Sequence, residues 1–350
     1  MPGQRHGRTP RRGGLAACAV AVLLAMAPSG RAEPVILGFA DLPGWAEDEP
    51  AEALAAFRHS CPALSDPEFR SLCAVAAQDP DARWFFETFF RPLWLDPDSP
   101  ARFTGYFEPE LPAARRPGGA YRFPLYRPPP GLQPGDPWLT RAGIDAGALA
   151  GRGLEIAWLR DPVDKYFLQV QGSGRLRLPD GSLVRLGFAA QNGHPRRSVA
   201  QALIDRGVLP AHAASVAAIR GWVRANPGAG QAALADDPSY VFFRELPRHD
   251  PALGPLGALN RPLTPGRSVA VDPAHVPLGA PVWVEVDGAL GWRRLMVAQD
   301  TGGAIRGVQR ADLFIGTGPA AGDLAGLVRD GGRMVVLLPI ERAFVVALGD

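Results

Sequence analysis

The stretch "AQDTGGAIRGVQRADLFIGTG", residues 298–318, says more about the fold than any other part of the chain. Its start completes the apolar run "RRLMVAQ" and enters a glycine-rich turn, and its end is a second apolar run, "ADLFIGTG". Short apolar runs separated by glycine turns are typical of β-strands. Three further runs of this kind, "RSVAV", "PVWVEV" and "RMVVLLP", lie nearby. We therefore expect a β-barrel in the C-terminal hundred residues.

The rest of the chain combines helices and strands. Residues 33–100 contain three segments with an apolar spacing of about 3.6 residues, "EPAEALAAFRHSC", "SDPEFRSLCAVAAQ" and "ARWFFETFFRPLWL", which predict helices. The middle segment "KYFLQVQGSGRLRLPDGSLVRLGFA" predicts a β-meander. "SVAQALIDRG" and "AASVAAIRGWVRAN" then predict amphipathic helices. The expected fold is mainly β with helices, in two lobes.

The composition agrees with a β-rich globular protein. The chain has 350 residues, 47% of them hydrophobic, with 41 glycines and 37 prolines. This length suits one large domain or two ordinary ones, and so many turn residues favour strands over a helical bundle. The first 32 residues hold five arginines and no acidic residue, so without them the net charge falls from +2 to −3. A nucleic-acid partner is therefore not expected.

The N-terminus, residues 1–32, resembles a secretory signal peptide. Arginines between positions 8 and 12 precede the apolar run Leu15–Ala27, and small residues allow cleavage after Ala32. This run is too short to anchor a chain across a bilayer. Two alternatives stay open, a buried N-terminal helix and lipidation at Cys18, which lies in the lipobox-like "LAAC". We expect an exported protein.

After cleavage, Cys61 and Cys73 are the remaining cysteines. Because an even pair in an exported protein suggests a disulfide, we expect a bridge that joins two neighbouring helices. The six histidines are scattered, and we expect neither a metal nor a cofactor.

Three aspartates at strand ends are the candidate catalytic residues. Asp300 leaves an apolar strand into a turn that contains Gly302 and Gly303, whose missing side chains allow a substrate to approach the backbone. Asp272 ends the run "RSVAV", and Asp312 precedes "LFIG". If these carboxylates converge, they raise one another's pKa, as a general acid requires. The alternative is that each aspartate only caps its own turn.

Candidate substrate-binding residues lie upstream. Thr104, Tyr106 and Glu108 alternate in "FTGYFEPEL", so they share one face of a strand, although an ordinary half-exposed strand has the same pattern. "QVQGSG" and "AAQNGHPRRS" supply further neutral hydrogen-bonding groups that suit sugar hydroxyl and acetamido groups. The candidates among them are Gln171, Gly172, Ser173 and Asn192.

The tripeptide Asp300-Thr301-Gly302 also occurs in aspartic peptidases. Those enzymes need two such loops, and this chain has a single one, so we set the peptidase hypothesis aside. The sequence also has no Gly-x-Ser-x-Gly frame for a nucleophilic serine.

Several motifs resemble, in order, the membrane-bound lytic murein transglycosylase A family. They are "GYFEPEL", "LQVQGSGRL", "DDPSYVFFREL", "GPLGALNRPLTPGRSVAVDPAHVPLGAPVWV" and "AQDTGGAIRGVQRADLFIGTG", spread over residues 95–340. Asp272, Asp300 and Asp312 match the three aspartates that name the family's C-terminal 3D domain.

The resemblance implies a double-psi β-barrel with a second β-rich lobe inserted into it and a substrate groove between them. Mapped onto this chain, the barrel domain comprises residues 33–105, including the helical N-terminal preface, and residues 241–350. The inserted substrate-binding domain comprises residues 106–240.

The family's activity implies that the protein cleaves the β-1,4 bond between N-acetylmuramic acid and N-acetylglucosamine in peptidoglycan. The products carry 1,6-anhydromuramoyl ends, in the turnover of the cell wall. Asp300 matches the catalytic aspartate, acting first as acid and then as base, with Asp312 and Asp272 in support. The implied location is the periplasm, with outer-membrane association left open because the lipobox around Cys18 is poorly placed. The implied partner is the glycan strand, bound by a monomer. A glycoside hydrolase and a non-catalytic peptidoglycan-binding protein remain as alternatives.

Overall fold

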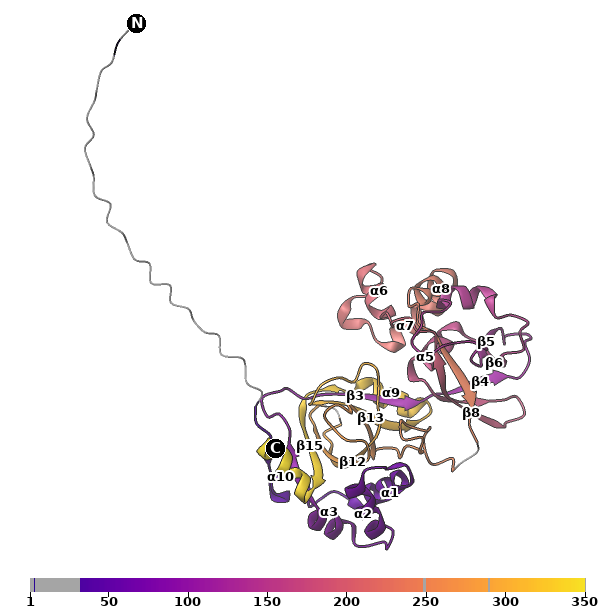
Figure 1. Cartoon of the computed structure of the whole chain (residues 1–350). Helices are drawn as coiled ribbons and strands as arrows, with labels where there is room; N and C mark the ends of the chain where they lie inside the picture. The colour runs from indigo at the N-terminus through magenta and orange to yellow at the C-terminus, as the bar shows by residue number, and fades with distance from the viewer. Residues whose placement is uncertain (1–2, 4–31, 248–249, 289, 350) are drawn as a thin grey trace.

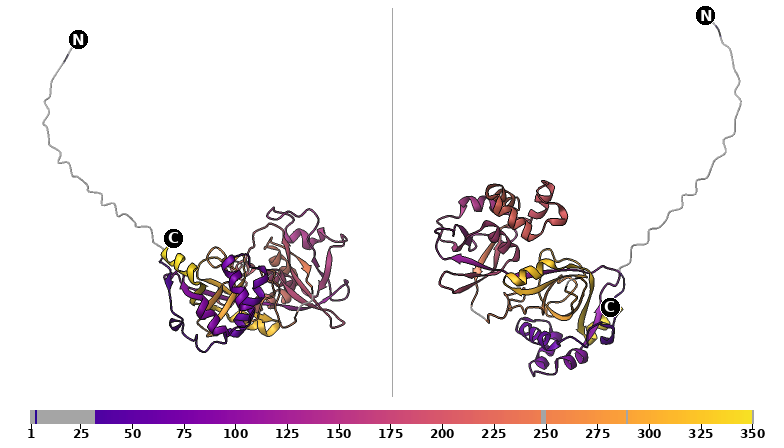
Figure 2. Two further views of the ribbon diagram at one scale, coloured as in Figure 1. Left: turned by 60° about the horizontal axis from the view of Figure 1, so that its bottom comes forward. Right: turned by 180° about the vertical axis from the view of Figure 1, so that it is seen from behind.

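The computed structural model describes residue 3 and residues 32–247, 250–288 and 290–349. The expected signal peptide, residues 1–32, therefore lies almost wholly outside the described residues. The described chain forms two lobes, each built on its own sheet (Figure 1). The C-terminal helix α10, Ile340–Leu348, contacts β1 and lies close to the start of the described main segment (Figure 2).

The larger lobe contains a nine-stranded mixed sheet. Its strand order is β1-β2-β15-β11-β12-β10-β13-β3-β14, with β10 parallel to β12 and β13 parallel to β3. Among the described residues the pairings run from β1 to β14 and do not close on themselves. The strands are β1 (Val35–Ile36), β2 (Phe90–Trp94), β3 (Arg102–Glu108), β10 (Ser268–Val271), β11 (Pro281–Val286), β12 (Arg293–Asp300), β13 (Arg310–Thr317), β14 (Arg329–Asp330) and β15 (Gly332–Pro339). The five apolar C-terminal runs are thus strands, as predicted.

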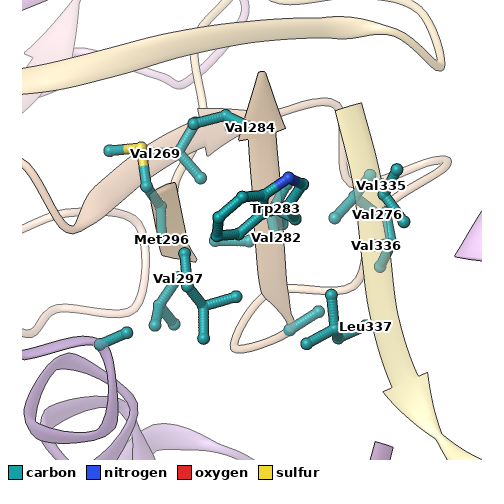
Figure 3. Close-up of a cluster of buried hydrophobic side chains, with 14 of the residues drawn as sticks. Val269, Val276, Val282, Trp283, Val284, Met296, Val297, Val335, Val336 and Leu337 are labelled. Carbon is teal, nitrogen blue, oxygen red and sulfur yellow. The ribbon is translucent and has the colours of Figure 1, made fainter. Parts of the chain in front are cut away.

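The core of this lobe surrounds β11, which is buried along its whole length. Trp283 lies at its centre, fully buried among valines of the neighbouring strands (Figure 3). Its ring meets that of Trp45 edge-on at 5.3 Å between centroids. A strand buried on both faces reads as a continuous apolar run, which explains the sequence "PVWVEV".

The predicted helical preface packs on the nine-stranded sheet (Figures 1 and 2). It consists of α1 (Pro50–Ser60), α2 (Pro67–Ala76) and α3 (Ala82–Phe89). The second half of the third predicted helical segment, Phe90–Trp94, is instead strand β2. Arg267, which is buried, joins this layer to the sheet through its ion pairs with Asp48 and Glu52, both at 2.9 Å. A disulfide links Cys61, directly after α1, to Cys73 in α2.

The smaller lobe contains a six-stranded sheet of order β5-β6-β4-β7-β8-β9 and a group of short helices. Its strands are β4 (Glu110–Ala114), β5 (Phe123–Tyr126), β6 (Glu155–Leu159), β7 (Gly174–Arg177), β8 (Leu183–Gln191) and β9 (Val241–Glu245). Its helices are α4 (Arg141–Gly143), α5 (Pro162–Gln171), α6 (Val199–Asp205), α7 (Val216–Ala225) and α8 (Pro227–Ala235). The larger lobe also carries α9 (Pro319–Leu327) beside β3 and β13.

One predicted strand is wrong. The segment "KYFLQVQ", expected as the first strand of a meander, lies in helix α5. Asp161 caps this helix by accepting a hydrogen bond from the backbone N–H of Val163, and Pro162 occupies the first turn. Gly172 ends it in the left-handed conformation with φ of 77°. These start and stop signals outweigh the β-propensity of the aromatic and branched residues between them.

The expected boundaries of the insert differ slightly from the change of sheet. β3 stays in the nine-stranded sheet as far as Glu108, and β4 begins the six-stranded sheet at Glu110. On the return path, β9 (Val241–Glu245) pairs with β8 in the smaller lobe, whereas the sequence assigned it to the larger one. The strand pairing therefore shows that the chain crosses from the larger to the smaller lobe at Pro109 and crosses back after Glu245. No helix in the described part of the chain is long and apolar enough to span a membrane.

Candidate active site

The candidate site lies across four neighbouring strands of the larger sheet. Ala270 on β10 is in register with Asp300 on one side and with Asp312 on the other. Asp312 is in turn in register with Thr104 on β3. A β-bulge at Val269–Ala270 interrupts the pairing beside Asp300. The two carboxylates therefore lie on strands separated only by the strand that carries a small alanine.

The Asp300 carboxylate accepts three hydrogen bonds. Its Oδ1 accepts from the backbone N–H groups of Ala258 at 3.0 Å and Thr301 at 2.9 Å. Its Oδ2 accepts from the Tyr106 hydroxyl at 2.9 Å. Two backbone donors fully occupy one oxygen, so Oδ2 is the atom that can carry a proton toward a ligand.

Burial raises the pKa of Asp300 to about 6, and the nearby Asp312 carboxylate adds to the increase. The three hydrogen bonds to the carboxylate lower the pKa, but burial has the larger effect. Burial, together with Asp300 and Asp312, also raises the pKa of Tyr106 well above its usual range. The phenol therefore stays protonated and can donate to Asp300.

Asp312 has a different set of contacts. Its Oδ1 accepts from the Thr104 hydroxyl at 2.6 Å, and Thr104 receives a hydrogen bond from Arg310 at 2.7 Å. Burial raises the pKa of Asp312, and the Thr104 hydrogen bond and the Arg310 charge oppose this increase. The Asp312 carboxylate is thus close enough to raise the pKa of Asp300, and of these two aspartates only Asp300 accepts a hydrogen bond from Tyr106.

Asp272 lies outside this pair. It contacts the far end of the loop that follows Asp300, residues 301–309, which we call the Asp300 loop. Its Oδ2 accepts from the backbone N–H of Gly307 at 2.8 Å, and its Oδ1 lies 3.5 Å from Arg306. Its Oδ1 also accepts from Ala274 N–H at 3.2 Å. The hydrogen bonds from Gly307 and Ala274 lower the pKa of Asp272, so it remains ionised. This matches the turn-capping alternative for that aspartate.

Two contacts that position Asp300 were missed from the sequence. Gly257 allows the segment that supplies Ala258 to pass close to β12, since a Cβ at Gly257 would lie 2.6 Å from the Gln299 carbonyl oxygen. Gln299 itself is buried, and its amide donates to the Ala56 carbonyl and the Ser60 hydroxyl of α1. The motif "GPLGALN" contained a signal for the first contact, a glycine where two backbones meet closely.

Not every predicted substrate-binding residue is accessible. Thr104 and Tyr106 lie half-buried in the site and contact its carboxylates. Glu108 is fully buried and forms an ion pair with Arg175 at 2.7 Å. Asn192 is also fully buried: it receives a hydrogen bond from Tyr240 N–H and donates to the carbonyl oxygens of Leu139 and Pro238. Strand alternation identified the face of Glu108 but did not show what covers it, and in this structure neither the Glu108 nor the Asn192 side chain is exposed to a ligand.

The other predicted substrate-binding residues differ in their exposure. Gln171, Gly172 and Ser173 form the partly exposed end of α5, in the smaller lobe. Gly303 is exposed, and a Cβ there would meet no atom within 4 Å. Gly302 instead packs against its own loop, because a Cβ there would lie 2.9 Å from Ile305. No group of three or more His, Cys, Asp or Glu side chains that could hold a metal occurs in the described segments.

Comparisons with known proteins agree with this arrangement. Residues 102–244 match the family model of the MltA specific insert domain, and residues 267–338 match that of the 3D domain. The crystal structure of a membrane-bound lytic murein transglycosylase from Agrobacterium tumefaciens is 33% identical and superposes with a TM-score of 0.80. That match covers 90% of this chain and 99% of the other. The chain belongs to the MltA family.

Two further MltA relatives bear on function. The membrane-bound lytic murein transglycosylase A of Vibrio cholerae is 36% identical over 245 residues, 66% of this chain and 64% of the relative. The chain thus spans slightly under two thirds of the length of the curated MltA proteins that it matches. The structure of Escherichia coli MltA with bound chitohexaose is 31% identical, with a TM-score of 0.70, covering 83% of this chain and 90% of that one.

Proposed function

We propose that this protein is a lytic transglycosylase that cleaves peptidoglycan without water, between N-acetylmuramic acid and N-acetylglucosamine. The observation that carries the proposal is a single carboxyl group, Asp300, with its pKa raised to about 6 at the end of a strand. Membership of the MltA family and the chitohexaose bound to its E. coli relative support a β-1,4-linked glycan as substrate.

In this mechanism Asp300 serves twice. Protonated Oδ2 donates its proton to the glycosidic oxygen, and the bond from that oxygen to C1 of the muramoyl residue breaks. The Asp300 carboxylate then takes the proton of the C6 hydroxyl of the same sugar, whose oxygen closes on C1 to form the 1,6-anhydro ring. The proton lost in the first step is regained in the second, so one residue completes the cycle. The Ala258, Thr301 and Tyr106 donors stabilise the carboxylate between the two steps.

The remaining carboxylates are poorly suited to hydrolysis. Most glycosidases use a second carboxylate as nucleophile or base. Glu108 is buried against Arg175, and Asp272 is held by Gly307, so neither is free to activate water. Asp312, bound by Thr104, supports a raised pKa at Asp300.

Muropeptide analysis tests the proposal. Purified peptidoglycan is digested with the protein, and the products are separated and weighed by mass spectrometry. We expect glycan ends lighter by one water than hydrolysis products, because the anhydro ring replaces the reducing end. Reducing ends would establish a hydrolase instead, and intact strands that bind the protein would indicate a non-catalytic binder.

The finer features of the fold are proposed on the same basis. We propose that the nine-stranded sheet closes as a double-psi β-barrel. In a flat sheet β3 and β12 would lie about 14 Å apart, three strand spacings, yet Tyr106 bonds to Asp300. The sheet must therefore curl at the site, which supports the barrel. We further propose that the larger lobe is a barrel domain and the smaller lobe an inserted substrate-binding domain. We also propose a signal peptide at residues 1–32 and a monomeric enzyme in the periplasm, in keeping with relatives that are named membrane-bound.

A further inference from the structure

The chain crosses between the lobes twice, and two arginines of the smaller lobe lie where both crossings pass. The first crossing runs from β3 through Pro109 into β4, and the second follows β9. Arg175 on β7 and Arg185 on β8 are cross-strand partners, and both are buried.

Arg175 binds both crossings at once. Its Nε donates to Glu108 Oε2 at 2.7 Å, at the last residue of β3. Its Nη2 donates to the carbonyl oxygens of Pro251 and Leu253, both at 2.9 Å, on the return path. The same nitrogen lies 3.2 Å from the Thr317 hydroxyl at the end of β13. The planar guanidinium fixes the directions of all these bonds, which an ammonium group cannot do.

Arg185 continues the contact toward the site. Its two terminal nitrogens donate to the carbonyl oxygens of Leu253 at 2.7 Å and Gly254 at 2.8 Å. Gly254 lies so close to β13 that a Cβ there would be 2.4 Å from the Phe314 ring. Phe314 packs against Tyr106 with 5.3 Å between ring centroids, and Tyr106 holds the catalytic candidate.

From these contacts we propose that Arg175 and Glu108 are positioning residues, which set the separation between the substrate lobe and the Asp300 loop. Glu108 is two residues from Tyr106 on the same strand, so a displacement of this pair moves the tyrosine relative to the smaller lobe. The inference rests on the proposed function for its kinetic consequence, but the separation of the lobes is measurable without any activity.

The neighbouring pair Arg177–Glu110 provides a matched control. It uses the same two residue types, two positions further along, and its atoms approach to 2.5 Å. Arg177 is 53% exposed, and both partners belong to the six-stranded sheet. This pair therefore does not connect the two lobes, and exposed ion pairs of this kind contribute little to stability.

The experiment compares Arg175→Lys with Arg177→Lys in the full chain. Nitroxide labels are placed at Ala217→Cys on α7 and Asp323→Cys on α9, both exposed, with Cys18→Ser to avoid a third label. Pulsed electron paramagnetic resonance then gives the distribution of distances between the lobes. We expect Arg175→Lys to broaden or shift this distribution, and Arg177→Lys to leave it unchanged.

Kinetics on peptidoglycan, without labels, complete the test. We expect kcat/KM of Arg175→Lys to fall on the order of 100-fold, the effect of a misplacement of about 1 Å. The apparent pKa of the pH profile should stay that of the wild type, since Asp300 keeps its own contacts. An unchanged distance distribution would overturn the proposal, and so would a changed one with wild-type kcat/KM. If the wild type releases no anhydro products, the proposed function fails while the distances still decide whether Arg175 sets the separation.

Discussion

The hydroxyl of Tyr106 lies 2.9 Å from Oδ2 of Asp300, although 194 residues separate them in the chain. The tyrosine lies on β3, before the inserted lobe, and the aspartate lies on β12, after it. This contact joins the two halves of the larger lobe at the atom where we propose that the proton moves.

Replacement of Asp300 by Asn should abolish turnover and leave glycan binding within a few-fold of the wild type. An amide oxygen can still accept from the Ala258 and Thr301 amides, so the loop keeps its shape, but the amide has no transferable proton. Activity is measured as release of anhydro-muropeptides, and binding by sedimentation with insoluble peptidoglycan. Asp323→Asn, at an exposed helical position, is the control. An active Asp300→Asn variant would show that another group is the acid.

The pH profile should respond to Tyr106. Since the acid must be protonated, kcat/KM of the wild type should decrease as the pH rises through about 6. In Tyr106→Phe the Asp300 carboxylate loses a hydrogen bond that stabilises its charged form. The limb of the pH profile along which kcat/KM decreases should therefore move upward by about one pH unit. Initial rates between pH 4 and 9 provide the measurement. A limb that stays in place, or moves down, would contradict the assigned direction of that hydrogen bond.

Asp300 should also make stability depend on pH. Its folded pKa is raised from 3.8 to about 6, so burial penalises the charged form. The contribution of Asp300 to the free energy of unfolding should therefore be highest below about pH 4 and decrease as the pH rises through 6. Asp300→Asn removes this penalty. Allowing for partial exposure, we expect it to be more stable than the wild type by about 2 kcal/mol at pH 7.5 and nearly equal at pH 4. Urea denaturation at both pH values measures this, and equal differences would refute it.

Asp272→Asn should loosen the Asp300 loop. The asparagine side chain can accept hydrogen bonds at its single oxygen only. It also lacks the negative charge that faces Arg306 and that strengthens the hydrogen bond from Gly307 N–H. We expect lower kcat, an unchanged pH limb and faster amide hydrogen exchange in residues 301–309. Asp287→Asn, which removes an exposed surface ion pair, is the control. A shifted pH limb with unchanged exchange would mean that Asp272 acts on Asp300 through its charge.

Much of the larger lobe could be predicted, because its strands are apolar runs between turns. Trp283 and its valine neighbours are buried on both faces, and such strands leave a strong pattern. Helix α5 was mistaken for a strand because its residues favour strands, while its helix signals, Asp161 with Pro162 and Gly172, stand at the ends.

The site was only partly predictable. Asp300 could be found because it ends an apolar run before a glycine turn, and Asp312 because it precedes an apolar run, although Asp312 lies inside β13 rather than at a strand end. The pairing of Tyr106 with Asp300, and of Glu108 with Arg175, depends on strands that are distant in sequence. A two-residue period gives the face of a strand, but the partner on a distant strand is set by tertiary structure, which a local pattern does not contain.

The parallel pairing of β3 with β13 also has a consequence for biosynthesis. Arg102 is in register with Arg310, so the ribosome must add some two hundred residues before the first strand of the site can meet its neighbour. Pairings this distant in sequence close late and slowly, because the long loop between them must first be ordered. A nascent or truncated chain that ends before β13 cannot complete the site. We therefore expect the protein to be inactive on the wall until β13 has been synthesised.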